Sequence, residues 1–163
     1  MIHIASDRIA EIKRRKHLLE KKLKVKIEIK GPTITIEAEP LDEFEASRVF
    51  EAINLGFSVE TALTILEEDI VFEKLNLKDY TRRKDLEIVR GRLIGTHGKT
   101  KDTLEEITGS EIKVKDNYVG IIGHGESITN TITAVTNIIR GSKQANAYKF
   151  LERINTRKKK VGF

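Results

Sequence analysis

The chain of 163 residues contains no cysteine, which excludes a disulfide framework and any metal site built on cysteine thiolates. No apolar run approaches the roughly 20 residues that a membrane-spanning helix needs. The first residues, M-I-H-I-A-S-D-R, lack the apolar core of a signal peptide. We therefore expect a cytoplasmic protein that does not contact membranes.

Histidine is also scarce. The four histidines are scattered along the chain, at spacings that suggest no metal triad: His3, His17, His97 and His124. No histidine can be combined with carboxylates into a constellation suited to RNA cleavage. We therefore expect no metal, no cofactor and no enzymatic activity.

Charge, in contrast, is abundant and unevenly distributed. Residues 6–30 carry ten Lys and Arg against four Asp and Glu, residues 31–81 carry three against twelve, and residues 82–163 carry seventeen against nine. The two basic segments favour contact with phosphate, whereas the acidic middle favours a different partner. A high content of Lys and Glu is also typical of the solvated surfaces of thermophilic proteins.

The most informative stretch is residues 90–114, which read R-G-R-L-I-G-T-H-G-K-T-K-D-T-L-E-E-I-T-G-S-E-I-K-V. An apolar turn leads into Gly95-Thr96-His97-Gly98, an amphipathic helix follows, and Gly109 precedes an alternating strand. Two glycines three residues apart let the backbone turn between helices and approach a ligand closely. The second helix would open at this turn and present its unpaired N–H groups there. We interpret Gly95–Gly98, the clamp, as a holder for the backbone of single-stranded nucleic acid.

Residues beside the clamp complete the predicted groove. Lysines would supply charge for phosphate, and Ile94, Ile112 and Val114 would form an apolar floor for bases. The predicted RNA-binding residues are Arg90, Arg92, Ile94, Gly95, Thr96, His97, Gly98, Lys99, Thr100, Lys101, Ile112, Lys113, Val114 and Lys115. A second G-x-x-G, Gly120 to Gly123, lies in a β-rich run with no basic residue inside it, so we expect a strand there.

The first half of the chain matches the second half at an offset of 85 residues. Ile27 falls on Ile112, and Gly56 falls on Gly141. So many matches in register predict a duplicated unit. The repeat fails at the clamp, because residues 10–13 contain no glycine.

Three basic residues remain beside the missing clamp of the first unit. Arg14, Arg15 and Lys16 are possible auxiliary phosphate contacts without sequence readout. A solvated helix face explains them equally well. We regard the first unit as mainly structural.

These patterns predict an α+β protein of two units, residues 1–81 and 82–163. In the first unit, Phe44 is expected to face inward from a helix over residues 41–55. Residues 57–81 carry too many apolar side chains for a loose linker, so we expect rigid docking of the units. Residues 157–160, R-K-K-K, are expected to form a disordered basic tail that attracts phosphate nonspecifically.

The clamp stretch resembles the KH signature. Three further strings, A-I-N-L-G-F-S-V-E-T-A-L-T-I-L-E-E-D, N-L-K-D-Y and Y-K-F-L-E-R, are similar to archaeal tandem-KH proteins related to the eukaryotic KH factor for small ribosomal subunit assembly. The resemblance covers essentially the whole chain. It implies two eukaryotic-type KH domains of order βααββα, each with a three-stranded sheet packed on helices on one face.

The resemblance also implies a function. It indicates a non-catalytic factor that holds the 3′ region of precursor small-subunit rRNA and cooperates with the endonuclease that trims it. Archaeal relatives usually carry a glycine clamp in the first unit, so its absence here looks more like the eukaryotic branch. The acidic region 31–81 is then a candidate surface for docking a protein. A KH adaptor in RNA decay, mRNA regulation or translation initiation, or a mainly protein-binding scaffold, remain alternatives.

Overall fold

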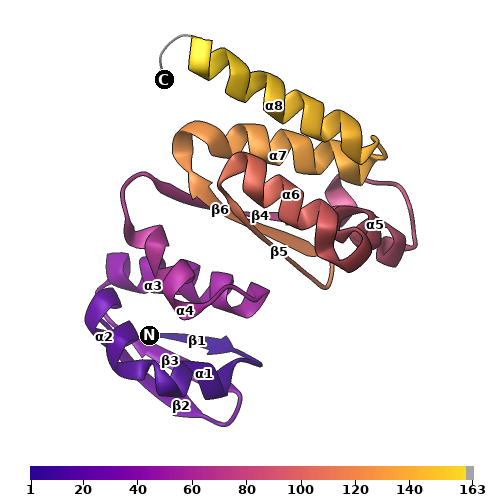
Figure 1. Cartoon of the computed structure of the whole chain (residues 1–163). Helices are drawn as coiled ribbons and strands as arrows, with labels where there is room; N and C mark the ends of the chain where they lie inside the picture. The colour runs from indigo at the N-terminus through magenta and orange to yellow at the C-terminus, as the bar shows by residue number, and fades with distance from the viewer. Residues whose placement is uncertain (161–163) are drawn as a thin grey trace. The chain divides into compact units, whose positions relative to one another are not determined.

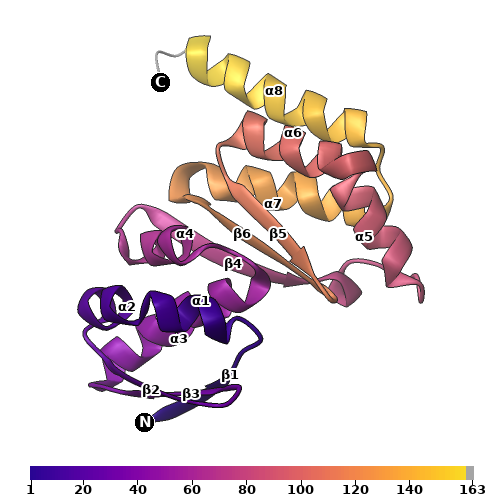
Figure 2. The same ribbon diagram turned by 60° about the horizontal axis from the view of Figure 1, so that its bottom comes forward.

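In the first unit, Met1–Ile70, alternating apolar segments form strands, and segments with apolar residues at helical spacing form helices. The computed structural model describes residues 1–160 of the chain. The elements are β1 (Ile2–Ala5), α1 (Ile9–Arg14), α2 (Lys16–Leu23), β2 (Lys26–Lys30), β3 (Thr33–Glu37), α3 (Pro40–Leu55), α4 (Val59–Leu63) and the 3-10 turn η1 (Thr64–Leu66). The sheet has the order β1-β3-β2, and Figure 2 shows α1, α2 and α3 on one of its faces.

The second unit, Val71–Phe163, repeats this order, with some elements longer than their counterparts. They are β4 (Ile70–Asn76), the 3-10 turn η2 (Leu77–Asp79), α5 (Leu86–Ile94), the 3-10 turn η3 (Thr96–Gly98), α6 (Lys99–Thr108), β5 (Glu111–Lys115), β6 (Tyr118–His124), α7 (Gly125–Arg140) and α8 (Gln144–Lys160). The sheet has the order β4-β6-β5. Helix α8 packs against α6 and α7 (Figure 1). The predicted mixture of helices with three-stranded sheets is confirmed.

The offset of 85 residues is visible in the structure. Both bounds of β2 and β5, and both bounds of α3 and α7, differ by 85. The helices end at Gly56 with φ of 113° and Gly141 with φ of 115°, a backbone conformation that glycine adopts without strain. The second G-x-x-G lies within β6, as predicted.

A carboxylate ties the second helix of each unit to the strand that follows it. In the first unit the Glu20 side chain accepts a hydrogen bond from the Ile27 N–H at 3.0 Å. In the second unit Glu105 accepts from the Ile112 N–H at 2.9 Å. The other oxygen of Glu105 lies 2.8 Å from the ammonium of Lys101. In both units, therefore, a glutamate of the second helix holds the backbone of the strand that follows.

Replacing Glu105 by Ala is expected to destabilise the second unit by about 2 kcal/mol, because the change leaves the Ile112 N–H without its charged acceptor. Urea unfolding followed by tyrosine fluorescence measures this, since all three tyrosines (Tyr80, Tyr118 and Tyr148) lie in the second unit and the chain has no tryptophan. The matched control is Glu106→Ala, at an exposed neighbour, which should change stability by less than about 0.5 kcal/mol. Equal effects of the two variants would contradict the support role.

Residues 57–81 do not form a separate connecting segment. Ser58 caps α4 by accepting a hydrogen bond from the Thr61 N–H at 3.1 Å. Helix α4 belongs to the first unit, but β4 pairs with β6 in the sheet of the second unit. The division therefore falls between Ile70 and Val71 instead of after residue 81. The apolar pattern of residues 70–76 indicates an extended segment, but it does not show which strand pairs with it.

The prediction that the basic residues 157–160 are disordered is also wrong. Residues 157–160 continue α8 as regular helix, while residues 161–163 lie outside the described part. Buried Leu151 anchors this helix, and the Asn155 side chain donates a hydrogen bond to the Ile107 carbonyl at 3.1 Å. Lysine and arginine favour helix, so an anchored helix continues through the basic run.

The prediction that Phe44 faces inward is wrong. It is 63% exposed on the first turns of α3, close in sequence to Leu41, which is 68% exposed. The inward face of the helix is formed by Ala46, Val49, Phe50 and Ile53, all fully buried. Among residues 1–160, no helix has the length and apolar character to cross a membrane.

Candidate nucleic-acid interface

The clamp connects α5 to α6 by a corner of bare backbone. Three of its four residues have positive φ, namely Gly95 (78°), His97 (54°) and Gly98 (77°). The Gly98 N–H donates to the Gly95 carbonyl at 3.1 Å, which closes the corner as a tight turn. Thr96 and His97 are exposed at its tip.

The two glycines of the clamp have different roles. A Cβ on Gly95 would lie 2.2 Å from the Thr100 Oγ1 and 2.7 Å from the Thr100 backbone nitrogen, far inside contact distance. A Cβ on Gly98 would meet only the Asp102 carboxylate, at 3.9 Å. Gly95 therefore lets the corner pack onto the first turn of α6, where Thr100 is buried. Gly98 leaves space open beside the backbone.

The N-terminus of α6 points its first N–H groups toward the corner. Gly98 occupies the N-cap position, and no side chain caps this end of the helix in the described structure. Uncapped N–H groups and the positive end of the helix dipole favour an anion. Lys99, the first residue of the helix, is exposed and adds a full positive charge. The arrangement suits a phosphate.

Lys101 is less available than its sequence position suggests. Its ammonium lies 2.8 Å from Glu105 and 3.4 Å from Asp102. Partial burial acts to lower the pKa of Lys101, but these carboxylates outweigh it and raise the pKa above its ordinary value. The side chain is therefore charged throughout the neutral range and already paired. Its main contact is with Glu105, the carboxylate that holds the backbone of β5.

The two predicted arginines of α5 hold parts of the protein backbone. Arg90 donates to the Asp116 carbonyl at 3.0 Å and to the Asn117 side chain at 3.2 Å, in the turn between β5 and β6. Arg92 donates to the Ile138 carbonyl at 3.2 Å and the Ser142 carbonyl at 2.6 Å, at the end of α7. The two guanidinium groups thus tie α5 to the turn between β5 and β6 and to the end of α7.

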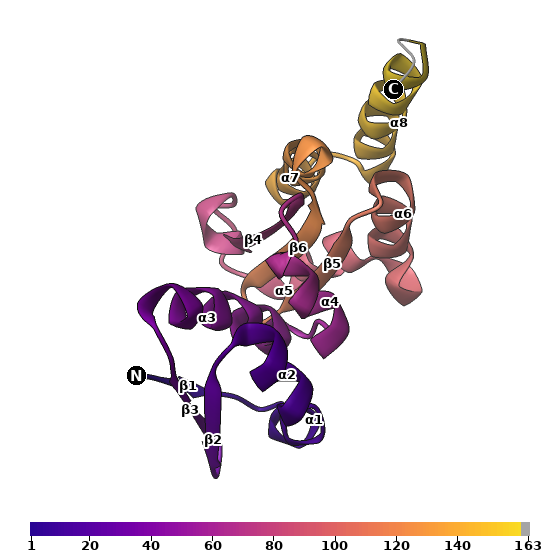
Figure 3. The same cartoon turned by 90° about the vertical axis from the view of Figure 1, so that its left-hand side faces the viewer.

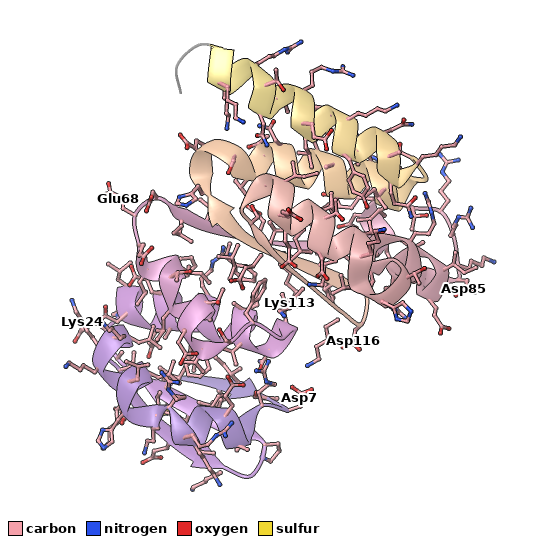
Figure 4. The ribbon with its side chains drawn as sticks, viewed as in Figure 1. Asp7, Lys24, Glu68, Asp85, Lys113 and Asp116 are labelled. Carbon is pink, nitrogen blue, oxygen red and sulfur yellow. The ribbon has the colours of Figure 1, made fainter. Side chains whose placement is uncertain are left out.

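Strand β5 lies beside α6 (Figure 3). The predicted apolar floor includes Ile112, but this side chain is fully buried in the core, so it cannot contact a base. Val114 and Ile94 are only partly buried, and the floor is limited to them. Because successive side chains alternate along a strand, Lys113 and Lys115 lie on the sheet face away from the helices, as Figure 4 shows for Lys113.

The first unit has no comparable corner. Only Arg15 separates α1 from α2, where the second unit has four residues between α5 and α6. The guanidinium of Arg15 forms an ion pair with Glu60 of α4. Of the predicted auxiliary cations, Arg14 is exposed and Lys16 is half-buried. Among the described residues, no group of three His, Asp or Glu is placed to hold a metal ion.

The sequence gives little sign of a pocket beside the clamp. Its volume is about 420 Å³, and α5, the clamp, α6 and α8 line it. Gln144 and Tyr148 of α8 contribute, although they lie more than 40 residues after the clamp. The Gln144 side chain donates to the Arg92 carbonyl at 3.2 Å and so holds α8 to α5. One available sequence signal is Gly91, a glycine in the interior of a helix.

A family model described as the eukaryotic-type KH domain (KH-domain type I) matches residues 71–156. The chain is 34% identical over 155 residues to a KH domain-containing protein of Methanocaldococcus jannaschii, which covers 91% of this chain and 68% of that protein. It is 29% identical to a pre-rRNA-processing protein, PNO1, of Debaryomyces hansenii, which covers 85% of this chain but only 57% of that protein.

A solved structure is similar over nearly the full length. It is the crystal structure of an a/eIF2alpha–aDim2p–rRNA complex from Pyrococcus horikoshii OT3. The match has a TM-score of 0.83 at 32% identity, and it covers 96% of this chain and 94% of the chain compared. The fold therefore occurs in a protein crystallised with rRNA.

Proposed function

Because the chain belongs to the family of eukaryotic-type KH domains (type I), we propose that it binds single-stranded precursor rRNA through the clamp. The observation that carries this proposal is the exposed backbone corner Gly95–Gly98 beside the uncapped end of α6. KH clamps of this kind grip about four backbone nucleotides.

The geometry supports backbone recognition with limited base contact. Phosphate would lie at Gly98 and Lys99, where no Cβ blocks approach and the helix dipole is favourable. Bases would rest on Ile94 and Val114, the two partly buried apolar side chains next to the corner. Phosphate contacts position a strand, whereas base contacts select its sequence.

A narrower role is supported by the names of the relatives. A pre-rRNA-processing protein and a protein crystallised with rRNA are both similar to this chain. We propose that the RNA is the 3′ region of the small-subunit rRNA precursor, that the chain acts in the cytoplasm, and that it works with the trimming endonuclease. In this role the chain has no catalytic activity, needs no cofactor, and carries two KH domains in rigid tandem.

Binding of labelled RNA tests the proposal. Fluorescence anisotropy should show tight binding of a single strand from the 3′ end of small-subunit rRNA and clearly weaker binding of the same sequence in a duplex. The recovered RNA, run on a denaturing gel, should be intact. Equal affinity for both forms would refute clamp recognition, and cleavage that is lost in His97→Ala would refute the non-catalytic role.

A protein-binding role is the second candidate, and exposed apolar residues favour it. Leu41 and Phe44 lie exposed on α3 among acidic residues of the segment 31–81. An apolar patch with an acidic rim suits a basic protein partner. In a pull-down from cells, reversing the charges of Glu43, Glu45, Glu67 and Glu68 should release such a partner, whereas an unchanged set of partners would remove this candidate.

Crosslinking in cells with sequencing of the attached RNA separates rRNA processing from the other RNA pathways.

A further inference from the structure

The pocket beside the clamp is lined by residues outside β5. Its walls come from α5, α6 and α8, and Gly95 and Thr96 of the clamp form its rim. A volume of about 420 Å³ falls within the range of about 300–1,000 Å³ typical of small-molecule sites. A strand that crosses the clamp would therefore have this pocket next to it as well as the apolar side chains of Ile94 and Val114.

Gly91 is the residue that keeps this pocket open. It lies in the interior of α5, where glycine destabilises a helix relative to alanine. It does not have the positive φ of the clamp glycines, and a Cβ placed on it would meet no atom within 4 Å. Neither the backbone nor close packing thus requires glycine here. Because Gly91 lines the pocket and a Cβ there would meet open space, a side chain much larger than a methyl group could extend into the pocket.

The chemistry of the lining fits one nucleotide. Ile88 is 49% exposed and Tyr148 is half-buried, so α5 and α8 each contribute an apolar side chain against which a flat ligand could pack. Among the described residues that line the pocket, the charged ones are the cations Arg92 and Lys99. An apolar, planar group joined to an anion satisfies both features, and a nucleobase with its phosphate is such a group.

We propose that this pocket receives the base of a nucleotide adjacent to those held by the clamp, with its phosphate at Lys99. This inference rests on the proposed RNA binding and adds a second base site to it. The first unit does not repeat the site. At its corresponding helix junction Arg15 is paired with Glu60, and the residue 85 positions after Glu60 is the uncharged Ala145. Among the described residues, we therefore place this base site in the second unit alone.

Filling the pocket tests the proposal. In Gly91→Leu the new side chain occupies the cavity while the clamp keeps its sequence, and Gly91→Ala is the matched control that fills almost nothing. Binding is measured by anisotropy with two labelled single-stranded RNAs, a tetramer and an octamer that contains it. Wild type and Gly91→Ala should bind the octamer about tenfold more tightly than the tetramer, as expected for one stacked base. Gly91→Leu should bind both RNAs with the affinity of the tetramer.

Ile88→Glu provides a second variant at an exposed position, and it should reduce octamer binding in the same way by placing a negative charge in the pocket. Circular dichroism should show that all three variants are folded. Octamer binding at the wild-type level by both Gly91→Leu and Ile88→Glu would overturn the proposal, as would a loss of tetramer binding equal to that of the octamer. If wild type binds neither RNA, the proposed function itself has failed and this site with it.

Discussion

A variant carrying Thr96→Asp and His97→Asp should lose almost all affinity for single-stranded RNA while remaining folded. Both side chains are exposed at the tip of the clamp, so the change places two negative charges where phosphate is expected. Like charges brought together at an interface cost several kcal/mol, which corresponds to a loss of about a hundredfold or more. Anisotropy with the rRNA strand at near-physiological salt measures this loss.

The stability of this variant should be close to wild type for a local reason. His97 has a left-handed backbone, with φ of 54°, and Asp adopts this conformation more readily than most residues. A control with the same added charge, His17→Asp with Thr129→Asp, changes two exposed positions outside the clamp. It should keep most of the affinity. A parallel loss in the control would assign the effect to overall charge and contradict the clamp.

Gly95→Ala is expected to destabilise the second unit by roughly 3 kcal/mol or more, whereas Gly98→Ala should cost only about 1 kcal/mol. Both glycines have positive φ, so backbone strain is common to the two changes. Only at Gly95 would the new methyl group lie within 3 Å of Thr100, including its backbone nitrogen. The pair thus separates steric overlap from backbone strain.

Urea unfolding followed by tyrosine fluorescence gives both values for the second unit. The effects of the two substitutions on RNA affinity should not follow their effects on stability. Gly98→Ala places a methyl group on the open side of the corner, so its affinity should fall even though it stays folded. Equal destabilisation by the two substitutions would show that Thr100 does not constrain the corner as the structure indicates.

The sequence predicts the repeated parts of the fold well. The bounds of β2 and β5, the glycine stops of α3 and α7, and the turn at the clamp depend on local patterns of apolar residues and glycines. These patterns act over a few residues, and tertiary packing agrees with them here. The site is predictable to the extent that it is built from one continuous stretch.

The remaining features depend on contacts between distant residues. Alternation shows that Ile112 and Val114 share a face of β5, but only the packed helices decide that Ile112 is fully buried. Arg90 and Arg92 are basic residues beside a clamp, yet their guanidinium groups bind carbonyls 26 and 46 residues away. The sequence offers no means to choose between a phosphate and a distant carbonyl as the partner of an arginine.

The single-residue junction at Arg15, with its ion pair to Glu60, gives the first unit no backbone corner like the clamp. If RNA is held at the clamp alone, avidity from two linked grips does not arise. The affinity measured for the full chain should then equal that of the second unit by itself.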